Sequence, residues 1–383
     1  MNRKEFLRQC GILGLGLPFL GILKSCKERN IHQKVTIIGA GAAGLTAGYL
    51  FQQLGVEFEI LEASATYGGR MKRSTTFADF PISLGAEWLH VEPSILGEIV
   101  NRNATTVAMN TIPYDSTVDY GLFKNQQITV AQMGFAHDRK FVNASWFDFF
   151  DQYIAPSIIG KIQFNEVVQS IDYTANKVVV KSQSTEYVSD KVIVTVPVKM
   201  LQKERIDFIP ALPQYKQHAI NAVTVWDGFK AFIEFSSKFY PAFTGFEVIP
   251  ETAGQKLYYD AAYGQHSNKS ILGLFAVGAP AQQLAALSDA ALKDYMLKEL
   301  DVVFNNHASA NYVKHVSHNW NAEPYIEGAY VYDHENWEHI VDLAESVADK
   351  VFFAGTSYGF ADDWGGVHVA ARSAQRAVDV ITR

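Results

Sequence analysis

The stretch Lys34-Val-Thr-Ile-Ile-Gly39-Ala-Gly41-Ala-Ala-Gly44 decides the fold of this chain. Its first half is a short apolar run, typical of a buried parallel strand, and its second half places three glycines at GxGxxG spacing. The first glycine permits a tight turn, Gly41 lets the backbone approach a pyrophosphate, and Gly44 lets the next helix pack closely on the sheet. The stretch therefore predicts a strand that leads into a helix whose N-terminus binds phosphate.

The following residues extend this prediction to a βαβ unit. We expect a helix from about Ala43 to Leu54, ended by Gly55, and a second strand that ends at Glu62. The Glu62 carboxylate would accept hydrogen bonds from ribose hydroxyls and would repel a 2′-phosphate. Because strand, glycines, helix, strand and acid follow in order, the pattern predicts a dinucleotide site, without separating FAD from NAD.

Further segments make the chain resemble the flavin-containing amine oxidase family, which includes monoamine and polyamine oxidases. The likeness begins at Gly68-Gly69-Arg70 and Leu84-Gly85-Ala86-Glu87-Trp88-Leu89-His90. It continues, in the family's order, through Val168–Ile171, Asp190–Pro197, Ile206–Pro213, Leu274–Phe304, Trp320–Tyr330 and the segment from Val351 onward. The resemblance implies an α/β FAD-binding Rossmann-type domain (GR2-like) with an inserted α+β substrate domain.

Both domains are expected to be discontinuous. Residues 31–92, 158–223 and 336–383 would form the FAD-binding domain, and residues 93–157 and 224–335 the substrate domain. The helical part of the substrate domain is short here, so its pocket should be more open or differently walled. Alternating Val and Ile runs predict strands at 177–181 and 192–196, and Ser288 is the predicted N-cap of a helix that runs to Phe304.

The resemblance also implies a set of cofactor contacts from both ends of the chain. The last helix, from Gly366 onward, would direct its N-terminal N–H groups at the flavin, where the helix dipole favours negative charge. Thr356 departs from the family pattern, which normally has an acidic residue at this position. The cofactor contacts are Gly39, Gly41, Ala43, Gly44, Glu62, Ala63, Gly69, Arg70, Gly85, Ala86, Glu87, Trp88, Val168, Trp320, Tyr325, Gly355, Thr356 and Val367.

Lys230 is a candidate for a catalytic role. Residues 228–235 alternate, so Lys230 and Glu234 share one strand face and four apolar side chains share the other. The pattern alone also fits a lysine that points into water, because lysine is mostly exposed. The resemblance implies instead a lysine that reaches a water near flavin N5, and burial would lower its pKa enough to move a proton near neutrality.

Tyr330, Trp364 and His90 are the other candidates for the catalytic site. The resemblance places Tyr330 in an aromatic wall beside the flavin, with ordinary aromatic core as the alternative. The family's opposite aromatic is replaced by Gly366, so Trp364 is the candidate to fill that space; otherwise the aromatic cage for an amine is half missing. His90 corresponds to a histidine that helps to define the substrate side in polyamine oxidases, although a single histidine is more often structural.

Composition restricts the kinds of partner that this chain can bind and the way in which it can hold a cofactor. A net charge of −7 argues against a nucleic acid partner. The only two cysteines are Cys10 and Cys26, so the thioether flavin link of some monoamine oxidases is excluded from the rest of the chain, and FAD is expected to bind non-covalently. His334 and His339 would lie about 140° apart around a helix and could not share a metal, so no metal is predicted.

Residues 1–30 are typical of a targeting segment. Basic residues between Arg3 and Arg8 precede an apolar stretch, 10–23, that is too short to span a bilayer comfortably. The start resembles a twin-arginine export signal, and Leu23-Lys24-Ser25-Cys26 resembles a lipobox. We expect export to the periplasm or cell envelope with a lipid anchor at Cys26, and an uncleaved N-terminal anchor helix is the alternative.

Together these features predict an exported, FAD-dependent oxidoreductase that acts on a small-molecule amine. The neutral amine would lose a hydride from its α-carbon to flavin N5, the imine would hydrolyse, and O2 or another acceptor would reoxidise the flavin. An amino-acid oxidase or a desaturase on the same fold is one alternative, because the second aromatic is lost. A flavin-binding lipoprotein with little turnover is another, because Gly366, Thr356 and the short middle region depart from the family.

Overall fold

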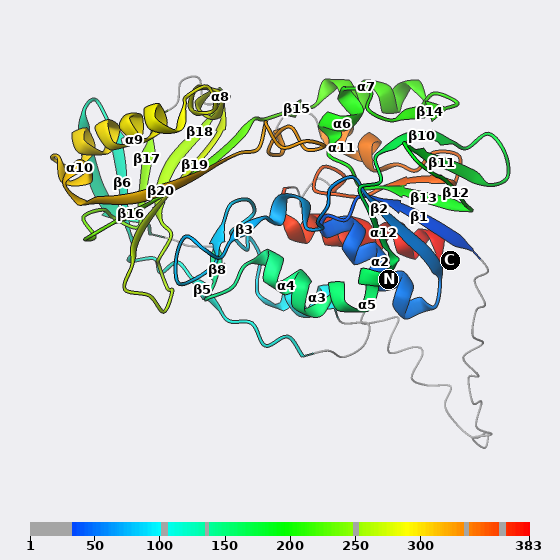
Figure 1. The fold of residues 1–383 in the computed structure, drawn as a ribbon, viewed down its shortest axis with the longest axis horizontal. Coiled ribbons are helices and arrows are strands. Elements are labelled where there is room, and N and C mark those ends of the chain that lie inside the picture. The colour runs from blue at the N-terminus through cyan, green and yellow to red at the C-terminus, as the bar shows by residue number, and fades with distance from the viewer. Residues whose placement is uncertain (1–32, 101–105, 135–137, 248–252, 333–336, 360–364) are drawn as a thin grey trace, which may run out of the picture. The chain divides into compact units, whose positions relative to one another are not determined.

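The computed structural model describes residues 33–100, 106–134, 138–247, 253–332, 337–359 and 365–383 (Figure 1). The predicted targeting segment with Cys10 and Cys26, the aromatic candidate Trp364, and His334 lie outside these ranges. Within them, no helix is both long and apolar enough to cross a membrane.

The predicted βαβ unit lies at the centre of a five-stranded parallel sheet, which confirms the Rossmann-type domain. β1 (Lys34–Ile38) leads into α2 (Ala42–Leu54), the left-handed Gly55 (φ 68°) ends this helix, and β2 (Glu57–Glu62) follows. The strand order is β22-β13-β1-β2-β9, and every pairing is parallel. The outer strands are β9 (Ile162–Phe164), β13 (Lys191–Val194) and β22 (Val351–Phe353).

The C-terminal helix α12 (Val367–Ile381) packs against α2, and the two lie side by side in red and blue in Figure 1. Close packing also explains Gly44: a Cβ at this position would lie 1.9 Å from the carbonyl oxygen of Gly39. The first turn of α2 can therefore approach the strand only because residue 44 lacks a side chain, as the spacing predicts. Residues from near the start and from the end of the sequence thus build one layer.

A second, four-stranded sheet in the order β12-β11-β10-β14 shares an apolar core with β13 and β22. The predicted strand at 177–181 is observed as β11, displaced by one residue. This sheet consists of β10 (Val168–Asp172), β11 (Val178–Ser182), β12 (Glu186–Ser189) and β14 (Asp207–Ile209). Three helices accompany this sheet: α6 (Val198–Gln202), α7 (Gln214–Ala222) and α11 (Trp337–Ala344). Of these, α7 contacts both α6 and α11.

The substrate sheet has seven strands in the order β20-β16-β19-β18-β17-β6-β7. One face of β16 packs through Phe229, Ala231, Ile233 and Phe235 into the same core as α9, so the predicted alternation is confirmed. Ser288 caps α9 as predicted, since its Oγ accepts a hydrogen bond from the Ala291 N–H at 3.3 Å. The strands are β6 (Asp119–Lys124), β7 (Gln127–Gln132), β16 (Gly228–Phe235), β17 (Phe243–Phe246), β18 (Gly254–Asp260), β19 (Ser270–Gly278) and β20 (Tyr312–Asn319). The helices are α8 (Ala279–Ala285), α9 (Asp289–Val303) and α10 (His307–Asn311).

Short elements connect these sheets, and several come from the region between residues 69 and 161. Among them, α3 (Ser94–Val100) contacts α12, and α5 (Ala155–Ile158) contacts α2. Part of segment 93–157 therefore packs on the nucleotide-binding helices, and the domain boundaries given above stay a prediction. These elements are η1 (Gly69–Met71), β3 (Arg73–Ser74), β4 (Ile82–Ser83), α3 (Ser94–Val100), β5 (Thr111–Pro113), β8 (Arg139–Phe141), α4 (Trp146–Tyr153), α5 (Ala155–Ile158), η3 (Ile159–Lys161), β15 (Thr224–Val225) and β21 (Val331–Tyr332).

Candidate active site

The glycine turn has the geometry of a phosphate cradle. Gly39 has a φ of 102°, and its N–H donates to the carbonyl oxygen of Leu61 at 2.8 Å. A Cβ at Gly41 would meet no described atom within 4 Å, and a Cβ at Gly69 would lie 3.4 Å from the Gly41 Cα. The N-terminus of α2 thus opens onto free space bounded by the Gly69 backbone, which fits a pyrophosphate group. Ala43 and Gly44 lie buried in the first turn of this helix.

Glu62 is fixed at the end of β2. Its Oε2 accepts a hydrogen bond from the Ala40 N–H at 2.7 Å, and its Oε1 accepts one from the Ser64 N–H at 2.8 Å, across Ala63. A carboxylate has about four lone-pair positions, so it can also accept hydroxyl donors. The carboxylate therefore lies next to the glycine turn and suits a ribose, as the sequence predicts.

Arg70 joins three distant segments of the chain. Its guanidinium donates to the Thr356 Oγ1 at 3.0 Å and to the carbonyl oxygen of Ala329. Burial lowers the pKa of Arg70 to about 10, so the side chain is still charged near neutral pH. Thr356, in place of the family's acid, accepts a hydrogen bond from this cation, and Gly355 beside it adopts a φ of 155°.

The segment 84–90 packs tightly onto Arg70. A Cβ at Gly85 would lie 1.9 Å from the Arg70 carbonyl oxygen, which also accepts the Ala86 N–H at 2.9 Å. The Trp320 Nε1 donates to the Leu84 carbonyl oxygen at 2.9 Å and so fixes the start of this segment. These contacts hold the backbone that presents Glu87, Trp88 and His90.

The structure gives a reason for the glycine where the family has a second aromatic. Gly366 has a φ of 105°, a conformation that side chains rarely adopt. A Cβ there would come within 3.6 Å of the His90 ring, so His90 lies beside this position. The His90 Nδ1 is 2.8 Å from the Asp138 Oδ1, and the His90 side chain is 48% exposed. The ring of His90 therefore borders the position of the missing aromatic.

Lys230 is buried, so the alternative of a strand lysine that points into water is wrong. Its residue is 3% exposed, and its Nζ lies 2.7 Å from the Glu87 Oε2 and 3.0 Å from the Ser83 carbonyl oxygen. The ring of Trp88 lies 5.1 Å from this Nζ. Burial lowers the pKa of Lys230 against the opposing effect of Glu87. Burial raises the pKa of Glu87, but nearby lysines hold it below its ordinary value.

The remaining predicted site residues are Tyr330, Tyr325, Val168 and Val367, and their surroundings differ from one another. The Tyr330 ring is 6.0 Å from the Trp226 ring, and burial raises the pKa of Tyr330 well above its ordinary value. Tyr325 lies on a turn with a φ of 64° and is 41% exposed. Val168 is buried in β10, and Val367 is the buried first residue of α12.

The sequence missed the ionic partners of the candidate lysine. Glu87 is a predicted cofactor contact, and its carboxylate also pairs with Lys230 and with Lys140 at 3.2 Å, and accepts a hydrogen bond from the Tyr259 hydroxyl. Lys140 belongs to β8, in a region without a clear pattern. No local signal links residues 87, 140, 230 and 259, because the pairing depends on tertiary structure.

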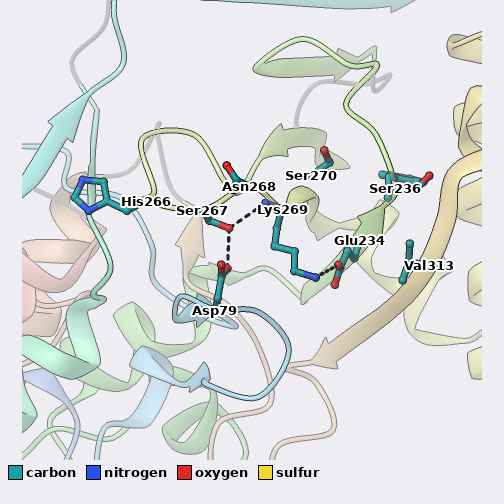
Figure 2. A pocket seen from close by; sticks show the side chains of 10 residues that line it. Asp79, Glu234, Ser236, His266, Ser267, Asn268, Lys269, Ser270 and Val313 are labelled. Atoms are coloured by element: carbon teal, nitrogen blue, oxygen red, sulfur yellow. Dashed lines mark hydrogen bonds and ion pairs between the residues drawn. The ribbon is translucent and has the colours of Figure 1, made fainter.

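A separate polar hollow of about 460 Å³ lies at the other end of β16, and Figure 2 shows its side chains. Lys269 reaches Glu234 across this hollow, and the Ser267 hydroxyl donates to Asp79 at 2.7 Å. None of the predicted site residues lines it. The hollow therefore does not belong to the candidate active site.

These features define a dinucleotide-binding oxidoreductase fold with a buried lysine on its substrate sheet. The family model for the flavin containing amine oxidoreductases matches residues 150–382, and a model for the NAD(P)-binding Rossmann-like domain matches residues 37–100. The chain belongs to the flavin-containing amine oxidoreductase family, whose members act on CH–NH donors.

Known proteins resemble the chain over most of its length. A probable polyamine oxidase 4 of Arabidopsis thaliana is 24% identical over 86% of this chain and 83% of its own length. The lysine-specific histone demethylase 1B of Mus musculus is 23% identical over 91% of this chain, which spans only 53% of that protein. A putrescine oxidase bound to putrescine superposes with a TM-score of 0.74 at 15% identity, covering 92% of this chain and 99% of that chain. The cyclohexylamine oxidase from Brevibacterium oxydans gives 0.74 at 15% identity, with 92% and 100% covered.

Proposed function

We propose that this protein oxidises a small-molecule amine at its C–N bond with non-covalently bound FAD. The observation that carries the proposal is the buried Lys230, held by Glu87 beside Trp88 on the substrate sheet. Burial lowers the pKa of this amine, so Lys230 releases a proton more readily than an exposed lysine, and amine oxidation requires a group that can hold and release a proton.

The chain offers residues that would hold FAD. The N-terminus of α2 at Gly41 would receive the pyrophosphate, Glu62 the ribose, and the N-terminus of α12 the flavin. Bound FAD would supply the hydride acceptor for the oxidation of the amine α-carbon and the route of the electrons to O2 or another acceptor. The chain's part is to orient the amine, to exclude water and to manage the proton at the Lys230 Nζ.

Two further observations support an amine as the substrate. The solved structures of similar fold include a putrescine oxidase with putrescine bound and a cyclohexylamine oxidase, and the sequence relatives include polyamine oxidases. In this chain, His90 lies next to Gly366, on the side where the aromatic cage is incomplete, and its ring pairs with Asp138. A polar wall of this kind suits an amine that carries a second polar or cationic group.

Anaerobic mixing tests the proposal. The purified yellow protein should lose the visible absorbance of its oxidised flavin with a monoamine, diamine or polyamine, and retain it with amino acids. Oxygen admitted afterwards should restore the absorbance with release of hydrogen peroxide; restoration only by an added dye would identify another acceptor. Acid precipitation should leave the yellow colour in the supernatant, because the chain outside residues 1–30 has no cysteine for a thioether link.

An amino-acid oxidase or a desaturase on the same fold is the second candidate. Gly366 favours it, because the family's second aromatic wall for an amine is absent from this position. The same panel separates the two candidates: loss of absorbance with amino acids alone, or with a carbon–carbon substrate alone, would replace the amine.

We also propose export to the periplasm or cell envelope, with a lipid anchor at Cys26. The support is the basic start, the short apolar stretch and the lipobox-like residues before Cys26. Mass spectrometry of the mature protein tests it: an N-terminus at a lipid-modified Cys26 is expected, and an intact Met1 would overturn the proposal.

A further inference from the structure

The carboxylate of Glu87 is shared between two buried lysines. Its Oε2 lies 2.7 Å from the Lys230 Nζ, and its Oε1 lies 3.2 Å from the Lys140 Nζ. Both lysines are 3% exposed, Glu87 is 8% exposed, and the Tyr259 hydroxyl also donates to the Oε2. Two ammonium groups and one carboxylate leave a buried excess of one positive charge, which is costly in a low-dielectric interior.

Lys140 and Lys230 differ in the number of oxygen atoms that face their ammonium groups. Lys140 faces three oxygens: the Ala261 carbonyl at 2.7 Å, the Asp260 carbonyl at 3.5 Å and Glu87. Lys230 donates to Glu87 and to the Ser83 carbonyl, and among the described residues no acceptor meets its third hydrogen. Of the two, Lys230 is therefore the one that can release a proton with the smaller loss of hydrogen bonds.

A small cavity strengthens this assignment. It measures about 10 Å³, close to the space that one water molecule needs, and it is lined by Glu87, Lys140, Ser83 and neighbouring residues. Lys230 is not among its lining residues. The cavity therefore adjoins Glu87 and Lys140 rather than the Lys230 amine.

We propose that Lys140 is a positioning residue that permanently balances Glu87, so that Lys230 can give up and regain its proton inside the site. When Lys230 loses its proton, a neutral Lys140–Glu87 pair remains. Without Lys140, the carboxylate would have Lys230 as its only buried cation and would hold the proton there. This inference rests on the proposed role of Lys230 in amine oxidation.

His318, Tyr259 and Tyr114 lie near Lys230, and their pKa values are shifted away from neutral pH. His318 is the cross-strand neighbour of Lys230 on β20, and burial lowers the pKa of His318 to about 4. Burial raises the pKa values of Tyr259 and Tyr114 well above the ordinary value. The Asp260 carboxylate is paired with Lys238 at 2.7 Å, and the Lys230 partner on β19 is the uncharged Phe275. The pH response of this cluster is thus expected to come from Lys230, whose pKa is lowered by burial.

The test uses two substitutions that act in opposite directions. Removal of a like charge by Lys140→Met should raise the pKa of Lys230 by about one unit or more, and removal of the opposite charge by Glu87→Gln should lower it by a similar amount. The measurement is the pH titration of the Lys230 side-chain carbon resonance in holoprotein labelled with ¹³C-lysine, assigned with Lys230→Met. The rate of flavin reduction by an amine should show the same two displacements of its pH profile.

Lys140→Arg, which keeps the charge, should leave the titration close to that of the parent. Lys238→Met is the matched control, because it removes an exposed lysine from the Asp260 carboxylate without touching Glu87. Displacement in the same direction by Lys140→Met and Glu87→Gln, or no displacement by Lys140→Met in a folded protein, would overturn the inference. The resonance titration needs no turnover, so it remains decisive even if no amine reduces the flavin.

Discussion

Lys216 and Lys230 are buried in different regions of the molecule, and their partners differ in kind. Lys216 on α7 is fully buried and donates to carbonyl oxygens at the end of α11, those of Asp342 at 2.7 Å, Leu343 at 3.0 Å and Glu345. Lys230 on the substrate sheet pairs instead with the carboxylate of Glu87. Lys216 links two helices through hydrogen bonds to uncharged carbonyl oxygens. Lys230 instead shares a carboxylate with a second lysine, which makes it suitable for proton chemistry. Burial alone does not distinguish a structural lysine from a chemical one.

The largest expected effect comes from Lys230→Met, which should slow flavin reduction by amine about 10³-fold. Glu87 keeps its pair with Lys140 in this variant, so the fold and the flavin content should survive. Rapid anaerobic mixing measures the rate, and the absorbance ratio of flavin to protein is the control. A holoprotein that is reduced at the parental rate would remove Lys230 from the mechanism.

Lys216→Met should act on stability and leave the chemistry intact. This substitution leaves three carbonyl oxygens, one of them buried, without their donor, which should lower the free energy of unfolding by about 3 kcal/mol. Urea unfolding of the holoprotein measures this loss. The reduction rate per bound flavin should stay parental, and a large fall in that rate would show that the contrast between the two lysines is wrong.

The two regions should also respond differently to acid. His318, beside Lys230, has a folded-state pKa of about 4, mainly because it is buried, against an ordinary value of 6.5. The folded state then binds fewer protons than the unfolded state between pH 6.5 and pH 4, so stability falls as the pH drops through this window. We expect a loss of about 2 kcal/mol at pH 4 that is missing in His318→Gln. Equal losses in the parent protein and in His318→Gln would show that a group other than His318 causes the acid sensitivity.

The smallest effect is expected from Thr356→Val, which removes the hydrogen bond from Arg70. One hydrogen bond to a charged group contributes about 1.5 kcal/mol, so FAD should bind roughly tenfold more weakly if this contact orders the site. Fluorescence titration of the apoprotein with FAD measures the affinity. Thr356→Ser keeps the hydroxyl and should bind as the parent does.

Local chemistry made much of the nucleotide region predictable. Glycine spacing, a helix stop at Gly55 and the acid at Glu62 act within a few tens of residues, so the sequence alone indicates this βαβ unit. The alternation along β16 likewise identifies which side chains share a face. It does not reveal that the face with Lys230 is buried, because Glu87 and Lys140 arrive from distant segments.

Two other features were beyond sequence reasoning for physical reasons. The β6–β7 hairpin is largely exposed and joins the substrate sheet by pairing β6 with β17, more than a hundred residues later, so it lacks a strong apolar pattern. Gly366 is visible as a departure from the family, but its positive φ and its place beside His90 depend on the folded backbone.

The packing of α12 on α2 has a consequence for biosynthesis. Roughly 300 residues separate the two helices, which at 5–20 residues per second corresponds to a delay of about 15–60 s during translation. Throughout that interval the side of α2 that contacts α12 lacks this neighbour on the nascent chain. Because we propose that the N-terminus of α12 binds the flavin, we expect FAD to be retained only after the polypeptide from β22 to α12 has left the ribosome.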